Sequence, residues 1–490
     1  MDRSLTLVID IGTSSVRASL YDAEAQSLKR AHSKITRSLA VSDDGGSQID
    51  ADAAVAQVCE AIDDLMLRTA RSRRPITLAA ASTFMHSLVG VDARGKPTTP
   101  VYSWADTRSG RYVADLRKHF DEDEVHNRTG ARFHSSYWPA KLLWLRHTQP
   151  EIWARTTRWL SLSDYVAHRL FGTVSSSVSM ASGTGVFDIR KCDWDTPVLR
   201  FLHVKRESLP SLAASDSDTF RLTPEFAKRW PRLAETNWLP SIADGAADNL
   251  GSRCITKRRA ALMIGTSGAM RVSYVGEPPE TIPTGLWCYR VDRKRVLIGG
   301  ALSDGGGLYR WLNDTLKLPK DAEGQIARRP PGSDGLTFMP FLAGERSTGY
   351  NENARGAILG LRSATDPVDI LQAALEAVAF RFAEIFEQLR RVIRVDEIVA
   401  SGGALRDSPV WTQIIADVIG RDLTMSTAHE SSSRGAVLLA LESIGKIERI
   451  EKTPPVPAVI VRHRPANHQA YREERKRHEE YYKTLSKFEP

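Results

Sequence analysis

Two spacings of apolar residues alternate along the chain, and they predict strands and helices in turn. Between Ala51 and Leu67 the apolar side chains recur at helical spacing, and residues 76–82 follow as a short buried strand. The ranges 141–147 and 159–170 are also predicted to be helical. This alternation indicates an α/β protein.

The second half of the chain contains the clearest predicted helix. From Asp369 to Ile393 an apolar residue returns at every third or fourth position, as in a helix that buries one face. Glu397–Ser401 is predicted to be a strand, and Pro409–Ile419 a helix. Between them Gly402 and Gly403 form a strand-to-helix turn, where a ligand can come close to helix N–H groups.

A short motif occurs once in each half. The segment Ile11–Arg17 is echoed by Ile264–Arg271, and each copy follows an apolar run and leads into strand-like residues. The turns themselves are Gly12, Thr13 and Ser14 in the first copy and Gly265, Thr266 and Ser267 in the second. Because such small turns expose N–H and hydroxyl groups to an anion, the repeat predicts two similar domains that hold one polyphosphate between them.

Composition and charge narrow the class of protein. The 490 residues are enough for two large domains or three, and 42% apolar with 26% charged residues is ordinary for a soluble globular protein. No apolar run approaches the ~18 residues of a membrane span, and the early Asp10 argues against a signal peptide. The four cysteines lack Cys-x-x-Cys spacing, which favours reduced thiols in a cytoplasmic protein over a zinc site. The net charge of +8 is spread out, so it favours a solvated basic surface over a nucleic-acid site.

Several longer motifs carry a family resemblance. Gly356–Leu361, followed by Asp369-Ile370 and Ala373–Glu376, matches the C-terminal signature of the FGGY carbohydrate kinases, and Lys141–Leu145 matches part of the N-terminal one. The chain resembles this family from about Leu5 to about Gly445. Within the family it is most similar to the gluconokinase branch, through four segments: Met85–Leu88, Trp104–Arg108, Met263–Arg271 and Gly299–Gly307.

The resemblance implies a two-domain fold in which each domain binds a different ligand. It implies two ribonuclease-H-like domains, of the actin, Hsp70 and hexokinase type, with an interdomain cleft where ATP, Mg²⁺ and a sugar meet. Residues 1–243 would form the sugar-binding domain and residues 244–450 the nucleotide-binding domain. Residues 451–490 would be a linker and a charged C-terminal helix.

Three residues are predicted to carry the chemistry. By resemblance Asp244 is the general base that accepts the sugar hydroxyl proton, and Asp10 orients Mg²⁺, through water, beside the phosphates. Arg17 would neutralise charge on the transferring phosphoryl group. Each has a plainer reading: Asp10 could satisfy turn N–H groups, Asp244 could cap a helix, and Arg17 could lie on the surface. Asp248 is the competing carboxylate beside Asp244.

The ligand-binding residues come from the same motifs. The expected sugar-binding set is Met85, His86, Trp104, Asp106, Arg108 and His134. For the nucleotide, Gly402 and Gly403 match the adenosine-binding turn and Gly306 matches a further contact, in addition to the two Gly-Thr-Ser turns.

The hypothesis from the sequence is an ATP-dependent sugar or sugar-acid kinase, with D-gluconate, phosphorylated to 6-phosphogluconate, as the favoured substrate. A carboxylate substrate needs a fixed positive partner, for which Arg108 is the first candidate and His134 the second. The alternatives are a kinase of xylulose or another sugar or polyol, a chaperone-like or filament-forming ATPase, and an inactive sugar-binding regulator. The expected ligands are small molecules, without nucleic acid or membrane, and a homodimer is one option for the assembly.

Overall fold

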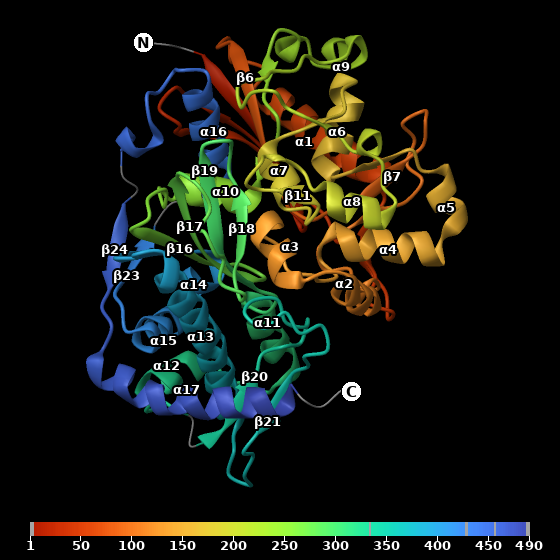
Figure 1. Cartoon of the computed structure of the whole chain (residues 1–490). Coiled ribbons are helices and arrows are strands. Elements are labelled where there is room, and N and C mark those ends of the chain that lie inside the picture. Colours follow the sequence, from red (N-terminus) through yellow and green to blue (C-terminus); the bar gives the residue numbers. More distant parts are fainter. Residues whose placement is uncertain (1–3, 333–334, 427–429, 455–456, 487–490) are drawn as a thin grey trace.

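The computed structural model describes residues 4–332, 335–426, 430–454 and 457–486, and it contains two α/β domains with the same sheet order (Figure 1). The first sheet runs β3 (Ser27–Thr36), β2 (Ser15–Tyr21), β1 (Leu5–Ile11), β6 (Ile76–Thr83) and β14 (Asn237–Trp238). In the second sheet the corresponding strands are β19 (Arg295–Leu302), β17 (Gly268–Val275), β16 (Arg259–Ile264), β22 (Glu397–Ser401) and β23 (Leu423–Ser426). Both sheets pair antiparallel across the first three strands and parallel beyond them. The shared order confirms the ribonuclease-H-like fold.

The alternation of side chains along β1 decides which residues face the second domain. Leu7 and Ile9 pack in one cluster with α1 (Ala51–Arg68) and α6 (Leu162–Phe171). Val8 lies in a different cluster, which includes α10 (Asp244–Gly251) and α16 (Ser431–Ser443). Because strand side chains alternate between faces, Asp10 lies on the Val8 face, toward the second domain.

Helices α10 and α16 form a layer between the two sheets. They pack closely against each other, and α16 also contacts β1 and β6 of the first domain, although it lies late in the chain (Figure 1). The short strand β15 (Ile242–Ala243) pairs with β6 and leads directly into α10. The boundary that the sequence predicts, at residue 243, is the last residue of β15 and directly precedes α10.

The core of the second domain is built around α13 (Pro367–Val392), close to the predicted Asp369–Ile393. Asp366 and Asp369 form a capping box at its start, and α15 (Pro409–Ile419) packs beside it. Strand β22 and helix α15 coincide with their predicted ranges.

The last forty residues depart from the expected linker and helix. The strand β24 (Ala458–Val461) pairs with β23, so the second sheet continues into a segment that was expected to be a linker. The predicted charged helix is α17 (Pro465–Leu485), which runs along the base of the second domain in Figure 1 and contacts α15 and β20 (Thr337–Met339). Tyr471 and His478 are its buried residues.

One predicted helix is wrong at its start. The range 159–170 begins with strand β9 (Arg158–Leu160), and α6 starts only at Leu162. Ser161 ends the strand because its side chain caps the helix, in a capping box with Asp164.

The remaining elements are short and lie mainly in the first domain. The other strands are β4 (Ala40–Val41), β5 (Ser47–Ile49), β7 (Val89–Val91), β8 (Val101–Tyr102), β10 (Ser175–Ser176), β11 (Phe187–Asp188), β12 (Asp193–Trp194), β13 (Ser211–Leu212), β18 (Trp287–Arg290) and β21 (Ala357–Leu359). The other helices are α2 (Val113–His119), α3 (Glu122–Thr129), α4 (Trp138–Thr148), α5 (Pro150–Arg155), α7 (Val178–Ser182), α8 (Thr196–Leu202), α9 (Pro224–Arg229), α11 (Gly306–Thr315), α12 (Ala322–Arg328) and α14 (Gly403–Asp407).

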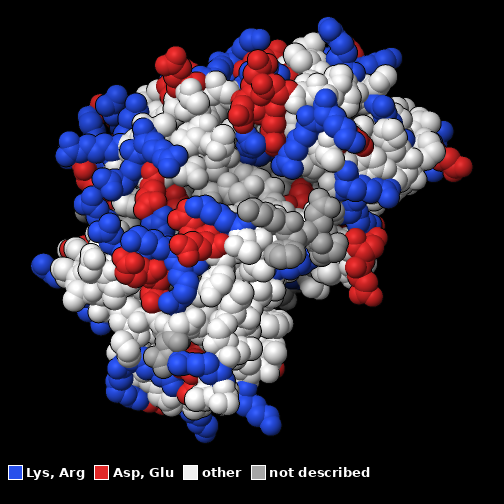
Figure 2. Space-filling view, turned by 60° about the horizontal axis from the view of Figure 1, so that its bottom comes forward, with Lys and Arg blue, Asp and Glu red and all other residues white. Residues whose placement is uncertain are grey.

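Two surface properties bear on the class of protein. Within the described ranges, no helix combines the length and the apolar character needed to cross a bilayer. Figure 2 shows basic and acidic side chains interspersed over the face that it presents. Such mixing is typical of a solvated protein surface.

Candidate active site

Asp10 and Arg17 form a fixed charge pair at the first Gly-Thr-Ser turn. Strand pairing places the two residues opposite each other, and Arg17 Nη1 lies 3.1 Å from Asp10 Oδ2. Asp10 is buried and accepts a hydrogen bond from Ser82 Oγ at 2.5 Å, whereas about 34% of the Arg17 side chain is exposed. The pair thus joins a held carboxylate to a guanidinium that a ligand can still reach.

The first turn has a second arginine behind it, which the sequence does not single out. The guanidinium of Arg37 donates to the Gly12 carbonyl, and its backbone N–H donates to Ser14 O at 2.9 Å. Burial lowers the pKa of Arg37 to about 10, so the side chain stays charged near neutral pH. Arg37 therefore clamps the turn and adds positive charge beside it.

The second turn forms one wall of a cavity of about 450 Å³. Gly306 N and Gly307 N donate to Gly265 O and Thr266 O, both at 2.9 Å, so the first residues of α11 are docked on the turn. Four of the residues predicted to bind the nucleotide line this cavity: Gly265, Thr266, Gly306 and Gly403. The rest of its wall includes Tyr309, Arg310, Asn313, Glu323 and Asp407. The structure brings these four predicted nucleotide contacts together.

The two glycines after β22 serve different purposes. Gly402 has a φ of +106°, and a Cβ there would lie 2.2 Å from the Ile264 carbonyl oxygen. Gly403 lines the cavity, and a Cβ there would meet no atom within 4 Å. Gly402 is therefore needed by the backbone, while Gly403 leaves open space for a ligand.

Asp244 stands at the first turn of α10, between the two sheets. Its Oδ1 accepts a hydrogen bond from Gly245 N at 2.7 Å. Burial raises the pKa of Asp244 to about 6; Arg271 opposes this rise, and Asp10 adds to it. A carboxylate with a pKa near 6 is ionised at neutral pH and is a stronger base than an ordinary aspartate.

Asp248 is one turn further along α10 and has a different role. Arg271 Nη2 lies 2.8 Å from Asp248 Oδ2, and both side chains are buried. The paired Asp248 is committed to the arginine, so Asp244 remains the available base. Arg271 lies two residues past the position on β17 that corresponds to Arg17, so the two arginines of the repeated motif are not equivalent.

The carboxylates between the two sheets could hold a metal ion only through one or two direct ligands. Within the described residues, no cluster of three or more His, Cys, Asp or Glu could enclose a metal ion. Asp10 does raise the pKa of both Asp244 and Asp248, which means that the three carboxylates repel one another across a short distance. A hydrated Mg²⁺, which binds through one or two carboxylates and otherwise keeps its waters, fits this arrangement.

Met85 and His86 extend from the end of β6 toward the second domain. His86 Nδ1 lies 2.5 Å from Gly183 O, and its Nε2 lies 3.4 Å from Arg346 Nη2. Burial, with Arg346 second, holds the pKa of His86 well below its ordinary value, so the ring is neutral. The contact with the carbonyl assigns the proton to Nδ1 and leaves Nε2 as an acceptor. Met85 packs in the cluster that contains Ala243, next to Asp244.

Asp106 and Arg108 are bound mainly to each other. Arg108 Nη2 lies 2.5 Å from Asp106 Oδ2 and 2.7 Å from Gln48 Oε1. The guanidinium lies over the rings of Tyr102 and Trp144, at 5.3 and 4.9 Å. Asp106 is fully buried. The two residues brace the loop that carries Trp104, and the positive charge of Arg108 is already neutralised.

Trp104 and His134 line a cleft of about 760 Å³, whose opposite wall comes from the second domain through Ser303, Leu342, Ala343 and Arg346. His134 Nδ1 accepts from Ser136 N at 3.1 Å, and its Nε2 lies 3.7 Å from Glu352 Oε1. Burial lowers the pKa of His134 and Glu352 opposes the change, so the ring is neutral. Arg346 and Arg355 are the two cations in the wall from the second domain, and the sequence motifs do not single out either of them.

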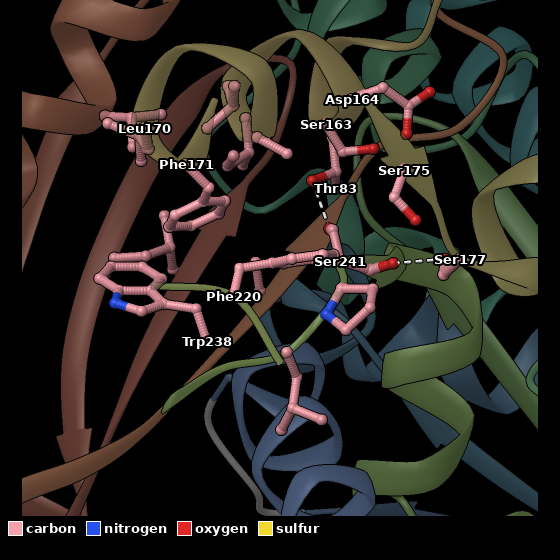
Figure 3. Close-up of a pocket in the computed structure, with 18 residues that line it drawn as sticks. Thr83, Ser163, Asp164, Leu170, Phe171, Ser175, Ser177, Phe220, Trp238 and Ser241 are labelled. Atoms are coloured by element: carbon pink, nitrogen blue, oxygen red, sulfur yellow. Dashed lines mark hydrogen bonds between the residues drawn. The ribbon is translucent and has the colours of Figure 1, made fainter. Parts of the chain in front are cut away.

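A smaller cavity of about 40 Å³ lies inside the first domain. Figure 3 shows Phe171 and Trp238 on one side of it and the hydroxyl groups of Ser163, Ser175 and Ser177 on the other. Thr83 and Ser241 share a hydrogen bond of 2.8 Å at its edge. The space holds about one water molecule, so this cavity belongs to the core and not to a substrate site.

Each of the two ribonuclease-H-like domains carries a Gly-Thr-Ser turn after its first central strand, and Asp10 interacts electrostatically with Asp244 at the start of α10. This arrangement is typical of a kinase-type phosphotransferase fold. Models of the FGGY family of carbohydrate kinases match residues 5–251 with the N-terminal domain and residues 260–443 with the C-terminal domain. The chain belongs to the FGGY family of carbohydrate kinases.

Individual relatives act on different substrates. The chain is 30% identical to the gluconokinase of Bacillus subtilis (strain 168), over 94% of this chain and 92% of that relative. Two solved structures from Lactobacillus acidophilus, a ligand-bound xylulose kinase and a gluconate kinase, superimpose with TM-scores of 0.90 and 0.89. Each is 25% identical, and each match covers 99% of both chains. The chain is therefore a sugar kinase whose relatives include both specificities.

Proposed function

We propose that this protein transfers the γ-phosphoryl group of ATP to a sugar acid, with D-gluconate as the substrate and 6-phosphogluconate as the product. The observation that carries the proposal is the position of Asp244, a partly exposed carboxylate without an ion-pair partner among the described residues, at the start of α10 between the sheets that bear the two turns. The likeness to gluconokinases supports the choice of substrate.

The proposed reaction assigns one task to each group. Asp244 accepts the proton of the terminal hydroxyl as that oxygen bonds to the γ-phosphorus, and the bond from phosphorus to the bridging oxygen breaks to release ADP. Arg17 and the N–H groups of the two turns stabilise the negative charge on the transferring group. Bound Mg²⁺ would neutralise phosphate charge, and Asp10 is the residue that would hold it through water.

The proposed binding sites divide between the two domains. The cavity formed by Gly265, Thr266, Gly306 and Gly403 would receive the nucleotide, with Ser267 and Gly402 shaping its wall from behind. Met85, His86, Trp104 and His134 would form the sugar surface of the first domain. Asp106 and Arg108 would support this surface by fixing the Trp104 loop.

The test is ADP release across a panel of sugars, polyols and aldonic acids, each with Mg²⁺ and ATP. We expect D-gluconate to give the highest kcat/KM. A far higher kcat/KM for xylulose or another neutral sugar would refute the substrate and leave a kinase of the alternative specificity, which the likeness to xylulose kinases supports. No ADP release with any acceptor would refute the kinase reaction itself.

A further inference from the structure

The C-terminal helix α17 contacts the back of a loop whose front lines the cleft. Four residues of this loop, which we term the cleft loop (residues 341–349), form part of the wall that the second domain contributes: Leu342, Ala343, Gly344 and Arg346. The match to the C-terminal domain of the family ends at residue 443, so α17 lies beyond it. The sequence predicts only a charged surface helix in this segment, and the contact with the cleft loop gives that helix a place near the site.

Tyr482 of α17 contacts the cleft loop at its beginning, middle and end. Its ring centre lies 5.7 Å from that of Phe341. Its hydroxyl donates a hydrogen bond to Glu345 Oε2 at 2.6 Å. A Cβ on Gly349 would lie 2.1 Å from the same hydroxyl oxygen, so the backbone passes too close to Tyr482 for any side chain there. One side chain of α17 therefore supports the whole loop.

Glu345 transmits this contact to the loop because it is buried and held at both carboxylate oxygens. Its Oε1 pairs with Arg381 of α13 and accepts a hydrogen bond from Gly349 N at 3.1 Å. Within the described residues, the hydroxyl of Tyr482 supplies the only hydrogen bond to Oε2. Burial raises the pKa of Glu345, and Arg381 and Tyr482 oppose the rise, so both partners favour the charged carboxylate. Without the hydroxyl, one oxygen of a buried charge would lack a partner, which costs free energy.

The front of the cleft loop meets the first domain beside Glu345. Arg346 follows Glu345 directly, and its guanidinium carbon lies 5.2 Å from the centre of the Trp104 ring. Its Nη2 lies 3.4 Å from His86 Nε2. The backbone of Glu345 also interacts with the His134 ring. A displacement of Glu345 would therefore move groups that face three residues of the proposed sugar surface.

We propose that Tyr482 is a positioning residue for the acceptor substrate: by holding Glu345, α17 fixes the cleft loop in the arrangement that binds the sugar or sugar acid. Tyr482 itself lines neither the cleft nor the nucleotide cavity. It favours binding because a wall that is already ordered loses little freedom when the acceptor enters. The inference rests on the proposed function, since it takes the cleft as the acceptor site, and it holds for either choice of sugar.

The experiment removes the hydroxyl and keeps the ring, in Tyr482→Phe. The acceptor is D-gluconate, or the compound with the highest kcat/KM in the panel if that is another. We expect kcat/KM for this acceptor to fall about 10-fold or more, the lower end for a hydrogen bond lost to a charged group, mainly through KM. Calorimetric ATP affinity should match wild type, because no described residue of α17 or of the cleft loop lines the nucleotide cavity.

Tyr471→Phe is the matched control, because it removes another buried tyrosine hydroxyl from the same helix. That hydroxyl also donates to a buried glutamate of α13, Glu376, at 3.2 Å, but neither residue lines the cleft or the nucleotide cavity. Both variants should lower the Tm, whereas only Tyr482→Phe should raise KM for the acceptor. An unchanged KM in Tyr482→Phe, an equal rise in Tyr471→Phe, or an equal loss of ATP affinity overturns the inference and leaves the kinase assignment standing. A wild-type enzyme that phosphorylates no acceptor of the panel refutes the proposed function, and the inference with it.

Discussion

Replacing Asp244 by asparagine should lower the activity and raise the stability of the protein. The carboxyl group of Asp244 is the proposed base, and keeping it ionised in the folded protein costs folding free energy. Asparagine keeps the acceptor for Gly245 N but cannot take a proton from the sugar hydroxyl. We expect phosphoryl transfer to fall by about 10²- to 10⁴-fold, the usual loss when a general base is removed. Calorimetric ATP affinity should stay near wild type, since the nucleotide cavity contains no atom of Asp244.

The effect on stability has a sign that depends on pH. Burial raises the pKa of Asp244 from 3.8 to about 6, so the folded state prefers the protonated carboxyl. Each pKa unit corresponds to about 1.4 kcal/mol, and ionised Asp244 therefore costs up to about 3 kcal/mol of folding free energy above pH 6. Below the unfolded-state pKa of 3.8 both states hold the proton and this cost disappears.

The assay pairs steady-state ADP release with urea unfolding at pH 8 and at pH 4. Asp244→Asn should raise the free energy of unfolding at pH 8 by up to about 3 kcal/mol, with little gain at pH 4. The wild-type kcat/KM should itself fall as the pH drops through about 6, where the base becomes protonated. A variant with near-wild-type turnover would remove Asp244 from the base role. Equal stability changes at both pH values would show that the burial of its charge is not the cause.

Three further outcomes can be measured. Gly403→Val should leave the fold intact and weaken ATP binding in a calorimetric titration, because the valine side chain enters the nucleotide cavity. Gly402→Ala should instead lower the Tm, because the new Cβ meets the Ile264 carbonyl. Unchanged ATP affinity in folded Gly403→Val would place the nucleotide elsewhere. Asp248→Ala leaves Arg271 buried without its carboxylate and should cost about 3–5 kcal/mol in urea unfolding, and a cost below about 1 kcal/mol would contradict a tight pair. Small-angle scattering should give a smaller radius of gyration with gluconate and a non-hydrolysable ATP analogue than without them, and an unchanged radius would argue against domain closure.

Local patterns were enough to predict much of the fold. The predicted strand before Gly402 and the predicted helix Pro409–Ile419 agree with β22 and α15. Both were predictable because the spacing of apolar residues within a strand or a helix depends only on residues close together in the sequence. The repeated Gly-Thr-Ser turn predicted two similar domains, because each copy of the motif can be recognised from the residues directly around it. The helix start at Leu162 was missed because a single capping residue, Ser161, outweighed an apolar run. Strand β24 was missed because its partner strand lies more than thirty residues earlier.

The candidate site depended more on the tertiary structure. The sequence by itself singled out Asp10, Asp244 and the glycines of the two turns. A tight turn and a charged residue at the end of an apolar strand can each be recognised from a few consecutive residues. It could not tell which of its 67 lysines and arginines reach the cleft without a carboxylate partner. Arg108 has its neutralising partner two residues away, while Arg346 meets His86 from 260 positions along the chain. The fold decided between them, because whether a buried charge is paired is set by the segments that packing brings around it, and these lie far apart in the sequence.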